Sequence, residues 1–477
     1  MNATSQERSR THAWLVFLIS ATGIFAATSA MTVVNVALPF ITKAFQSDVS
    51  TSQWVLLSYL LTTSSLLINA GRLGDILGPF RMHQAGLLIL ITSSFFCALS
   101  RTEGMLVTFR IFEGLGGAMI ISNGPGAVTS FFPPRQRGKV LGLLAGIVGT
   151  SLSVGPAIAG FLVEVFGWRS IFIYNVPIGI LGLVLGRFVP ALPRETGKVN
   201  IDIAGGLLLF LFIVSFVLGL DGIRRFGWSS PAVLFLSALF LLCLSGFILA
   251  ERTVRHPMLD LRLFRNPTFA LAQAGNFLGH MSTMGVFFLM PFYLVGALKV
   301  SAQASGLILL PLTVMMVVIG PASGYFSDHL GTKWPAVCGM VLTCLGLFSL
   351  TSLAQDTSIL GVMLRLALLG AGRAVYQSPN FSAAMGSVRK DYIGVAGGVY
   401  AATRHLGSLS GIAVVGSYFS ARQASYLQRE SPGDSIGAVP FLAALQDTFL
   451  LSLGIAALGF LTALFEKELN AATHHRP

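Results

Sequence analysis

The chain has 477 residues, of which 54% are hydrophobic and only 10% are charged, and its mean hydropathy is +0.76. Because a soluble domain carries about 25% charged residues, this composition excludes a soluble globular protein and indicates an integral membrane protein. The formal net charge of +12 does not indicate a nucleic-acid partner, because the basic residues fall mainly in alternate loops, as in membrane proteins.

Long apolar runs, each close to the length of about 20 residues that crosses a bilayer, follow one another along the chain. They are far longer than the strands of a membrane barrel, so we expect an all-α integral membrane fold. The first run is too long for the apolar core of a cleavable signal peptide. We predict about fourteen spans, at residues 14–38, 53–70, 83–99, 105–131, 140–163, 170–186, 202–220, 231–250, 268–290, 303–326, 335–353, 358–383, 393–418 and 441–465.

The distribution of basic residues predicts the orientation of these spans. Most of the 31 Lys and Arg lie in segments that are cytoplasmic if the N-terminus is inside, so we expect both termini in the cytoplasm. Arg224 and Arg225, in the loop after the seventh span, oppose this trend. Because the rule is statistical, the expected orientation stands, and we expect a multi-pass protein of the plasma membrane.

A short charged stretch follows the second span. It holds three glycines, a proline, two arginines and one aspartate within Gly71–Arg81. Since each charge at the centre of a bilayer costs about 2.5–3.5 kcal/mol or more, the stretch predicts a tight turn between two spans. The residues singled out in it are Gly71, Arg72, Gly74, Asp75, Gly78 and Arg81.

A related stretch, Gly324–Lys333, returns in the second half of the chain with Asp328 and Lys333. Two such turns separated by so many residues indicate a protein built from two related halves.

Glu113 is the carboxylate that lies deepest within a predicted span, and Arg110 precedes it by three residues. Residues three apart share a helix face, so the two side chains can form an ion pair. One hypothesis is a structural lock. The other is proton coupling, because an ionisable group inside a membrane is a functional candidate and can exchange a proton when its surroundings change.

The polar residues within the spans of the second half are mostly basic or neutral. Arg365 and Arg404 can extend toward the membrane surface, although Arg404 lies nearer the middle of its span. Arg373 is either held by backbone carbonyls or lines a cavity where it pairs with an anionic or strongly polar substrate. His280 is either a hydrogen-bonded core residue or a proton relay. The candidate cavity residues of this half are His280, Arg373, Tyr376, Gln377 and Arg404.

The sequence predicts no metal site and no cofactor. The four cysteines, Cys97, Cys243, Cys338 and Cys344, all lie in apolar runs without metal-ligand spacing and are predicted to be buried packing residues. No nucleophile–base pair or paired His/Asp motif is found at a predicted membrane face, so we do not expect an enzyme.

Five stretches together resemble the major facilitator superfamily, in particular its fourteen-span drug:proton antiporter branch, and the resemblance runs through nearly the whole chain. Gly71–Arg81 is similar to the loop signature between spans two and three, and Arg110–Ala118 to the fourth-span signature. Gly149–Pro156 with Gly160 is similar to the fifth-span antiporter signature. The remaining two stretches are Thr32–Pro39 in the first span, and Trp168–Phe172 with Asn175–Pro177 near the sixth.

The resemblance implies two six-span bundles with two spans added between them. The expected parts are residues 1–198, an N-terminal six-span bundle; 199–262, two additional spans with a cytoplasmic link; and 263–477, a C-terminal six-span bundle. A substrate site, with Asn35 among its candidate residues, would lie midway across the membrane and open alternately to each side. Asp75 would act as a gate, with Asp328 and Lys333 as its copy.

The fifth-span signature implies close helix packing by Gly149, Gly155 and Gly160. Pro156 is expected to bend the helix where the lost hydrogen bond is tolerated.

The chain departs from the family at two positions. Glu113 stands where the family usually has a glutamine-like residue, which adds a titratable group. Ala30 stands where the family commonly has an acid, two residues before Thr32. In the family, that acid is linked to the recognition of cationic drugs and to coupling. Ala30 therefore removes a group associated with both functions.

These observations predict a secondary transporter that exports small amphipathic compounds in exchange for protons. The alternative is a dedicated exporter of an anionic or neutral metabolite. A non-transporting sensor is a distant alternative, because it would require a sizeable soluble domain or tail. The expected partners are a small-molecule substrate, protons and the lipid bilayer, and the expected state is a monomer.

Overall fold

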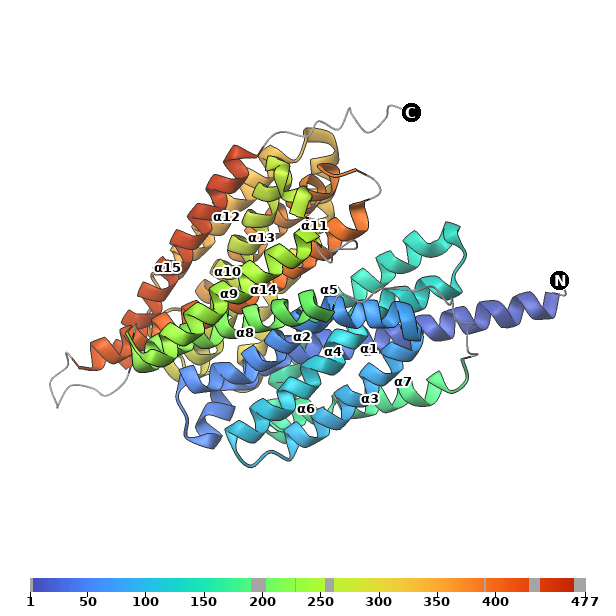
Figure 1. Cartoon of the computed structure of the whole chain (residues 1–477). Helices are drawn as coiled ribbons and strands as arrows, with labels where there is room; N and C mark the ends of the chain where they lie inside the picture. The colour runs from blue at the N-terminus through green and yellow to red at the C-terminus, as the bar shows by residue number, and fades with distance from the viewer. Residues whose placement is uncertain are drawn as a thin grey trace. The chain divides into compact units, whose positions relative to one another are not determined.

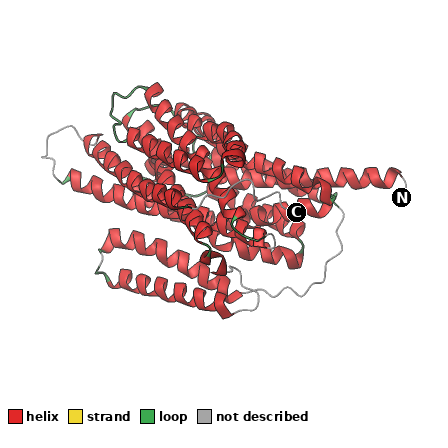
Figure 2. Cartoon of the chain, turned by 90° about the horizontal axis from the view of Figure 1, so that it is seen from above, coloured by secondary structure: helices red, strands yellow, loops and turns green. Residues whose placement is uncertain are grey.

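The computed structural model describes residues 3–189, 203–227, 229–253, 261–389, 392–428 and 438–466. The described part of the chain is almost entirely helical and contains no strand (Figure 2), which confirms the predicted all-α fold. Its Cα atoms divide into two compact units: the first is Met1–Ser47 with Trp54–Ile213, and the second is Asp48–Gln53 with Val214–Pro477.

The first unit contains most of the helices of the N-terminal half, drawn from blue to green in Figure 1. They are α1 (Ala3–Phe45), α2 (Val49–Leu77), α3 (Pro79–Ala98), α4 (Glu103–Phe131), α5 (Pro134–Phe166), α6 (Ser170–Ile173) and α7 (Asn175–Gly186). The predicted sixth span is thus two helices, which are interrupted at Tyr174.

The helix α8 (Ile203–Phe226) begins in the first unit and continues into the second. The other elements of the second unit are α9 (Pro231–Thr253), η1 (Leu261–Arg265), α10 (Pro267–Phe292), η2 (Tyr293–Ala297), α11 (Ala302–Leu330), α12 (Lys333–Leu350), α13 (Ile359–Gly386), α14 (Ile393–Leu427) and α15 (Ala438–Phe465). Three of these helices begin with a side-chain cap: Asn266, Ser301 and Ser358 accept a backbone N–H at the starts of α10, α11 and α13.

Ten of the described helices are long and apolar enough to cross a membrane, and α2 is an eleventh, with a bend of 52°. The helices α3, α7 and α14 correspond to predicted spans but are shorter or more polar than this set. The multi-pass membrane fold is therefore confirmed, and the count of fourteen stays a prediction.

The two units share one packing order. In the first unit, α1 packs on α4, α5 and α7, and α3 packs on α4 and α7. In the second, α10 packs on α13, α14 and α15, and α12 packs on α13 and α15. The two orders match when α10, α11, α12, α13, α14 and α15 are paired in turn with α1, α2, α3, α4, α5 and the pair α6–α7. This match supports the prediction of two related halves.

The stretch Gly71–Arg81 contains the predicted tight turn, but most of its residues are helical. The helix α2 continues to Leu77 and α3 begins at Pro79, so the break lies at Gly78, whose φ is 97°. The prediction that all cysteines are buried is wrong, since Cys338 is exposed and Cys344 partly exposed.

Candidate functional site

Arg110 and Glu113 form an ion pair inside the first unit. Both lie on α4, and Arg110 Nη1 is 2.8 Å from Glu113 Oε2. Their side chains are 1% and 0% exposed, respectively. The spacing of three residues places them on one helix face, as the sequence predicted, and their burial removes both charges from solvent.

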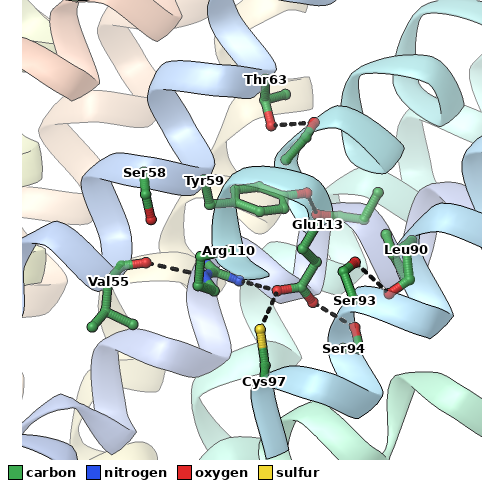
Figure 3. Close-up of polar contacts among 12 residues, drawn as sticks. Val55, Ser58, Tyr59, Thr63, Leu90, Ser93, Ser94, Cys97, Arg110 and Glu113 are labelled. Carbon is green, nitrogen blue, oxygen red and sulfur yellow. Dashed lines mark hydrogen bonds and ion pairs between the residues drawn. The ribbon is translucent and has the colours of Figure 1, made fainter. Parts of the chain in front are cut away.

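Two side chains of α3 also donate to Glu113 (Figure 3). The Ser94 hydroxyl is 2.6 Å from Oε1, and the Cys97 thiol is a weaker donor at 3.9 Å from Oε2. A charge-assisted hydrogen bond such as that of Ser94 is stronger than a neutral one. Glu113 therefore has hydrogen-bond donors from two helices, α3 and α4.

Arg110 joins α4 to α2. Its Nε donates to the carbonyl oxygen of Val55 at 2.9 Å, and its guanidinium lies over the ring of Tyr59, 4.4 Å from the ring centroid. The Tyr59 hydroxyl in turn donates to the carbonyl of Ala27 on α1 at 2.5 Å. Three helices thus meet at one buried ion pair, and Tyr59 connects it to a fourth, α1. Among the described residues, the second terminal nitrogen of Arg110, Nη2, has no hydrogen-bond partner.

Glycines of the fourth-span signature allow this close approach. A Cβ on Gly114 would collide with the backbone of Tyr59, and one on Gly117 would collide with the Tyr59 hydroxyl. A Cβ on Gly116 would likewise meet the backbone of Gly86 on α3. The signature therefore combines the ion pair with the small residues that let α2 and α3 pack against it.

The predicted gate residues surround the end of α2. A Cβ on Gly74 would collide with Asn123 of α4, and Asn123 Nδ2 donates to the carbonyl of Ala70 at 2.9 Å. Asp75 and Arg81 are exposed, and Arg72 and Gly71 are partly buried. Close packing of α2 on α4 therefore accounts for Gly74, and the gate role of Asp75 stays a prediction.

The copy of this stretch has a similar geometry. A Cβ on Gly324 would contact Ser378 of α13, and Gly331 has φ 86°, as Gly78 has φ 97°. Lys333 opens α12 and lies 5.9 Å from the ring centroid of Trp334. The side chain of Asp328 lies outside the described residues.

The fifth-span signature packs against α1. A Cβ on Gly155 would collide with the Thr32 hydroxyl, and the Ser151 hydroxyl donates to the carbonyl of Phe25 at 3.0 Å. Pro156 lies inside α5 and is buried, as is Gly160, while Gly149 is partly buried. Asn35 of α1 is 6% exposed, and no described residue donates a hydrogen bond to its Oδ1.

The candidate cavity residues of the second unit gather between α10, α13 and α14. Arg373 is 1% exposed and lies over the ring of Tyr376, 5.5 Å from its centroid. His280 of α10 is within electrostatic range of Arg373 and Arg404. Gln377 is partly buried on α13. The structure thus brings His280, Arg373, Tyr376 and Arg404 together.

Amide side chains connect the helices around this group. Asn380 donates to the Tyr376 hydroxyl at 2.6 Å and to the carbonyl of Ala272 on α10 at 3.0 Å. Asn276 of α10 donates to the Thr403 hydroxyl of α14 at 2.9 Å. Arg365, two turns before Arg373, donates instead to Ser352 at 3.2 Å and is partly exposed.

Sequence reasoning did not identify Ser94, Cys97, Tyr59 or Asn123. Serine and cysteine are common in spanning helices, and their contacts depend on how α3 faces α4. Tyr59 carried a usable signal, since an aromatic residue in a span close to a predicted buried arginine is a candidate cation–π partner.

The comparisons with known proteins agree with this architecture. The family model of the Major Facilitator Superfamily matches residues 20–412. The chain is 29% identical to the riboflavin transporter RibZ of Clostridioides difficile, over 95% of this chain and 97% of that protein. It is 31% identical to the tetracenomycin C resistance and export protein of Streptomyces glaucescens (86% and 76%), and 30% identical to the multidrug transporter protein MdtP of Bacillus subtilis (83% and 73%).

Solved structures share the fold at low sequence identity. A bacterial homologue of the human lysosomal transporter Spinster, in an inward-facing and unoccupied conformation, matches with a TM-score of 0.68 at 17% identity, over 96% of this chain and 97% of that chain. An auto-inhibited peptide transporter of the POT family matches with a TM-score of 0.69 at 14% identity, over 98% and 99%. The chain is a multi-pass membrane transporter of small molecules, and it belongs to the major facilitator superfamily.

Proposed function

We propose that this transporter exports small amphipathic compounds in exchange for protons, as a member of the fourteen-span drug:proton antiporter branch. The buried ion pair between Arg110 and Glu113 is the observation that carries the proposal. The names of the similar proteins support export, since they include an antibiotic resistance and export protein and a multidrug transporter.

Glu113 is suited to carry the proton because Arg110, in the same unit, balances its charge. Protonation of its carboxyl would break the ion pair, and Arg110 would keep the Val55 carbonyl and the Tyr59 ring as partners. The helices α2, α3 and α4 all contact this pair, so its loss alters contacts between three helices at once. A change of protonation is thereby coupled to helix packing.

Alternating access follows from the two related halves. The proposed parts are an N-terminal bundle (1–198), two additional spans with a link (199–262) and a C-terminal bundle (263–477). Asp75, exposed near the end of α2, would act as a gate that stabilises one conformation and releases it in the other. Gly155 lets α5 lie close to α1, and Pro156, inside α5, would bend this helix.

The proposed setting is the plasma membrane, with both termini in the cytoplasm and a monomeric transporter.

A dedicated exporter of one anionic or neutral metabolite is the second candidate function. The buried Arg373, close to His280 and Arg404, favours it, and one similar protein is named for a single compound, riboflavin. Ala30, buried in α1 where an acid would suit cationic drugs, agrees with this candidate.

The test begins with a resistance and uptake screen of diverse compounds in cells, with and without a protonophore, to find an exported compound. That compound is then added to proteoliposomes containing the purified protein and an internal pH dye. We expect substrate addition to move protons in the wild type. We expect Glu113→Gln to abolish this coupled proton movement while the protein remains in the membrane.

Glu103→Gln is the matched control, because Glu103 opens the same helix but is separate from the ion pair. It should retain coupled proton movement. Unchanged proton-driven transport in Glu113→Gln would remove Glu113 from the mechanism, and the absence of proton movement in the wild type would contradict antiport itself.

A further inference from the structure

Arg373 is a buried cation that the ion pair of the first unit does not explain. Its side chain is 1% exposed, and neither Nη1 nor Nη2 has a hydrogen-bond partner among the residues that the structure describes. Within the part of the chain that the structure describes, no ion pair joins it to a carboxylate. An arginine at this depth in a membrane protein is costly, and such residues generally serve a function.

The fold itself does not require a side chain at this position. Gly114 and Gly370 correspond in the two units, because a Cβ on either would meet the carbonyl of the neighbouring helix, at Tyr59 and Leu312 respectively. By the same spacing, Arg373 corresponds to Gly117. In the first unit, α4 packs with a glycine at this position. Helix packing therefore does not explain why α13 of the second unit has an arginine there.

The surroundings of Arg373 fix the guanidinium in place. It lies against Gly279 of α10, where a Cβ would collide with Nη1, and its charge rests on the Tyr376 ring at 5.5 Å. Tyr376 is itself held by Asn380. A planar group that lies against a helix and an aromatic ring, and whose two terminal nitrogens have no partner among the described residues, is preorganised to bind two oxygens at once.

The local charge is positive. His280 lies within electrostatic range of Arg373, Arg404 and His405, and its buried Nε2 has no hydrogen-bond partner in the described part of the chain. Glu466 is the carboxylate that acts on this neighbourhood, and it acts on Tyr376 and Tyr400 rather than on Arg373. A substrate anion would therefore meet several basic side chains, and the nearest of them, Arg373, is not paired with a carboxylate of the described residues.

We propose that Arg373, together with His280, binds the anionic oxygens of the exported compound, and that the preferred substrates are amphipathic carboxylates. This inference rests on the proposed export function and adds the chemical class of the substrate. The two terminal nitrogens of Arg373 match the two oxygens of a carboxylate, and His280 Nε2 supplies a further polar contact.

The experiment compares head groups on one scaffold. Purified protein in detergent is titrated with naphthoate, naphthamide and naphthylmethylamine, and with the same three head groups on biphenyl. The apparent melting temperature reports binding. We expect the carboxylates to stabilise the wild type at lower concentration than the amides or amines, and Arg373→Gln to weaken carboxylate binding about tenfold or more.

Arg365→Gln is the matched control, since Arg365 lies on the same helix and has Ser352 as a partner; it should keep the preference. Arg373→Lys should bind carboxylates more weakly than the wild type, because an ammonium lacks the planar fork.

The comparison of head groups on the wild type needs no variant, so a poorly folded Arg373→Gln does not prevent a decision. Carboxylates that stabilise the wild type no better than the amides, or not at all, overturn the proposal, as does an unchanged preference in Arg373→Gln. Because the assay contains no membrane and no pH gradient, a failure of proton coupling leaves its result unaffected. The two proposals can therefore fail separately.

Discussion

Ser94 of α3 donates its hydroxyl proton to Glu113 of α4 across 2.6 Å, in a region closed to solvent. This contact ties the third helix of the first unit to the ion pair of the fourth. The adjacent residue, Ser93, donates only to carbonyls of its own helix, those of Ile89 and Leu90. Of these two neighbouring serines, Ser94 contacts the buried carboxylate and Ser93 does not (Figure 3).

Ser94→Ala is expected to destabilise the protein more than Ser93→Ala. Loss of a donor to a buried charged oxygen costs about 1–3 kcal/mol, whereas a serine bonded back to its own helix contributes little. The apparent melting temperature of each purified variant in detergent measures the difference. Equal losses in the two variants would show that the Ser94 contact does not stabilise Glu113.

Arg110 and Glu113 are expected to be strongly coupled in a double-mutant cycle. Arg110→Gln leaves a buried carboxylate without its cation, which costs about 3–5 kcal/mol. Glu113→Gln should cost less, because Arg110 keeps the Val55 carbonyl and the Tyr59 ring. The double variant should recover part of the loss, and stabilities of the four proteins that simply add would contradict a functional ion pair.

The fold could be predicted largely from composition and from glycine. The apolar runs predicted the helices, and the repeat of Gly71–Arg81 at Gly324–Lys333 predicted two halves that share a packing order. The tight turn predicted in Gly71–Arg81 is confined to Gly78, the one residue of this stretch with a positive φ. Arg72 and Asp75 remain within α2, so charge alone did not locate the end of the helix.

The site could be predicted only in part. Arg110 and Glu113 lie on one helix, so their spacing was enough to predict the pair. Ser94 and Tyr59 come from other helices, and nothing in the sequence sets the rotation of α3 or α2 relative to α4. Arg373 was a candidate for the same reason as Glu113, but its lack of a partner became visible only with the packed helices.

Gly78→Ala and Gly331→Ala are each expected to destabilise the protein by an amount on the order of 1–3 kcal/mol, because a side chain strains the backbone at φ 97° and 86°. Gly138→Ala is the matched control. Gly138 lies in α5 with open space around its Cβ position, so alanine there should be neutral or mildly stabilising. Melting temperatures check both statements, and a tolerated Gly78→Ala would show that the helix break depends on other contacts.

Glu466 is expected to make stability fall as the pH rises. It directly follows α15 and is 2% exposed, and burial raises its pKa from 4.5 to about 8, against the opposing effect of Lys333. A carboxyl with a raised pKa in the folded state stabilises that state fully below the unfolded value, and the contribution is lost as the pH rises through the folded value. The window is therefore about pH 4.5 to 8, and Glu466→Gln should flatten the melting temperature across it. Asp447→Asn, which removes the ion pair with Arg422 at 2.6 Å, should leave the slope in place. Parallel pH curves for the wild type and Glu466→Gln would show that Glu466 is charged throughout this range.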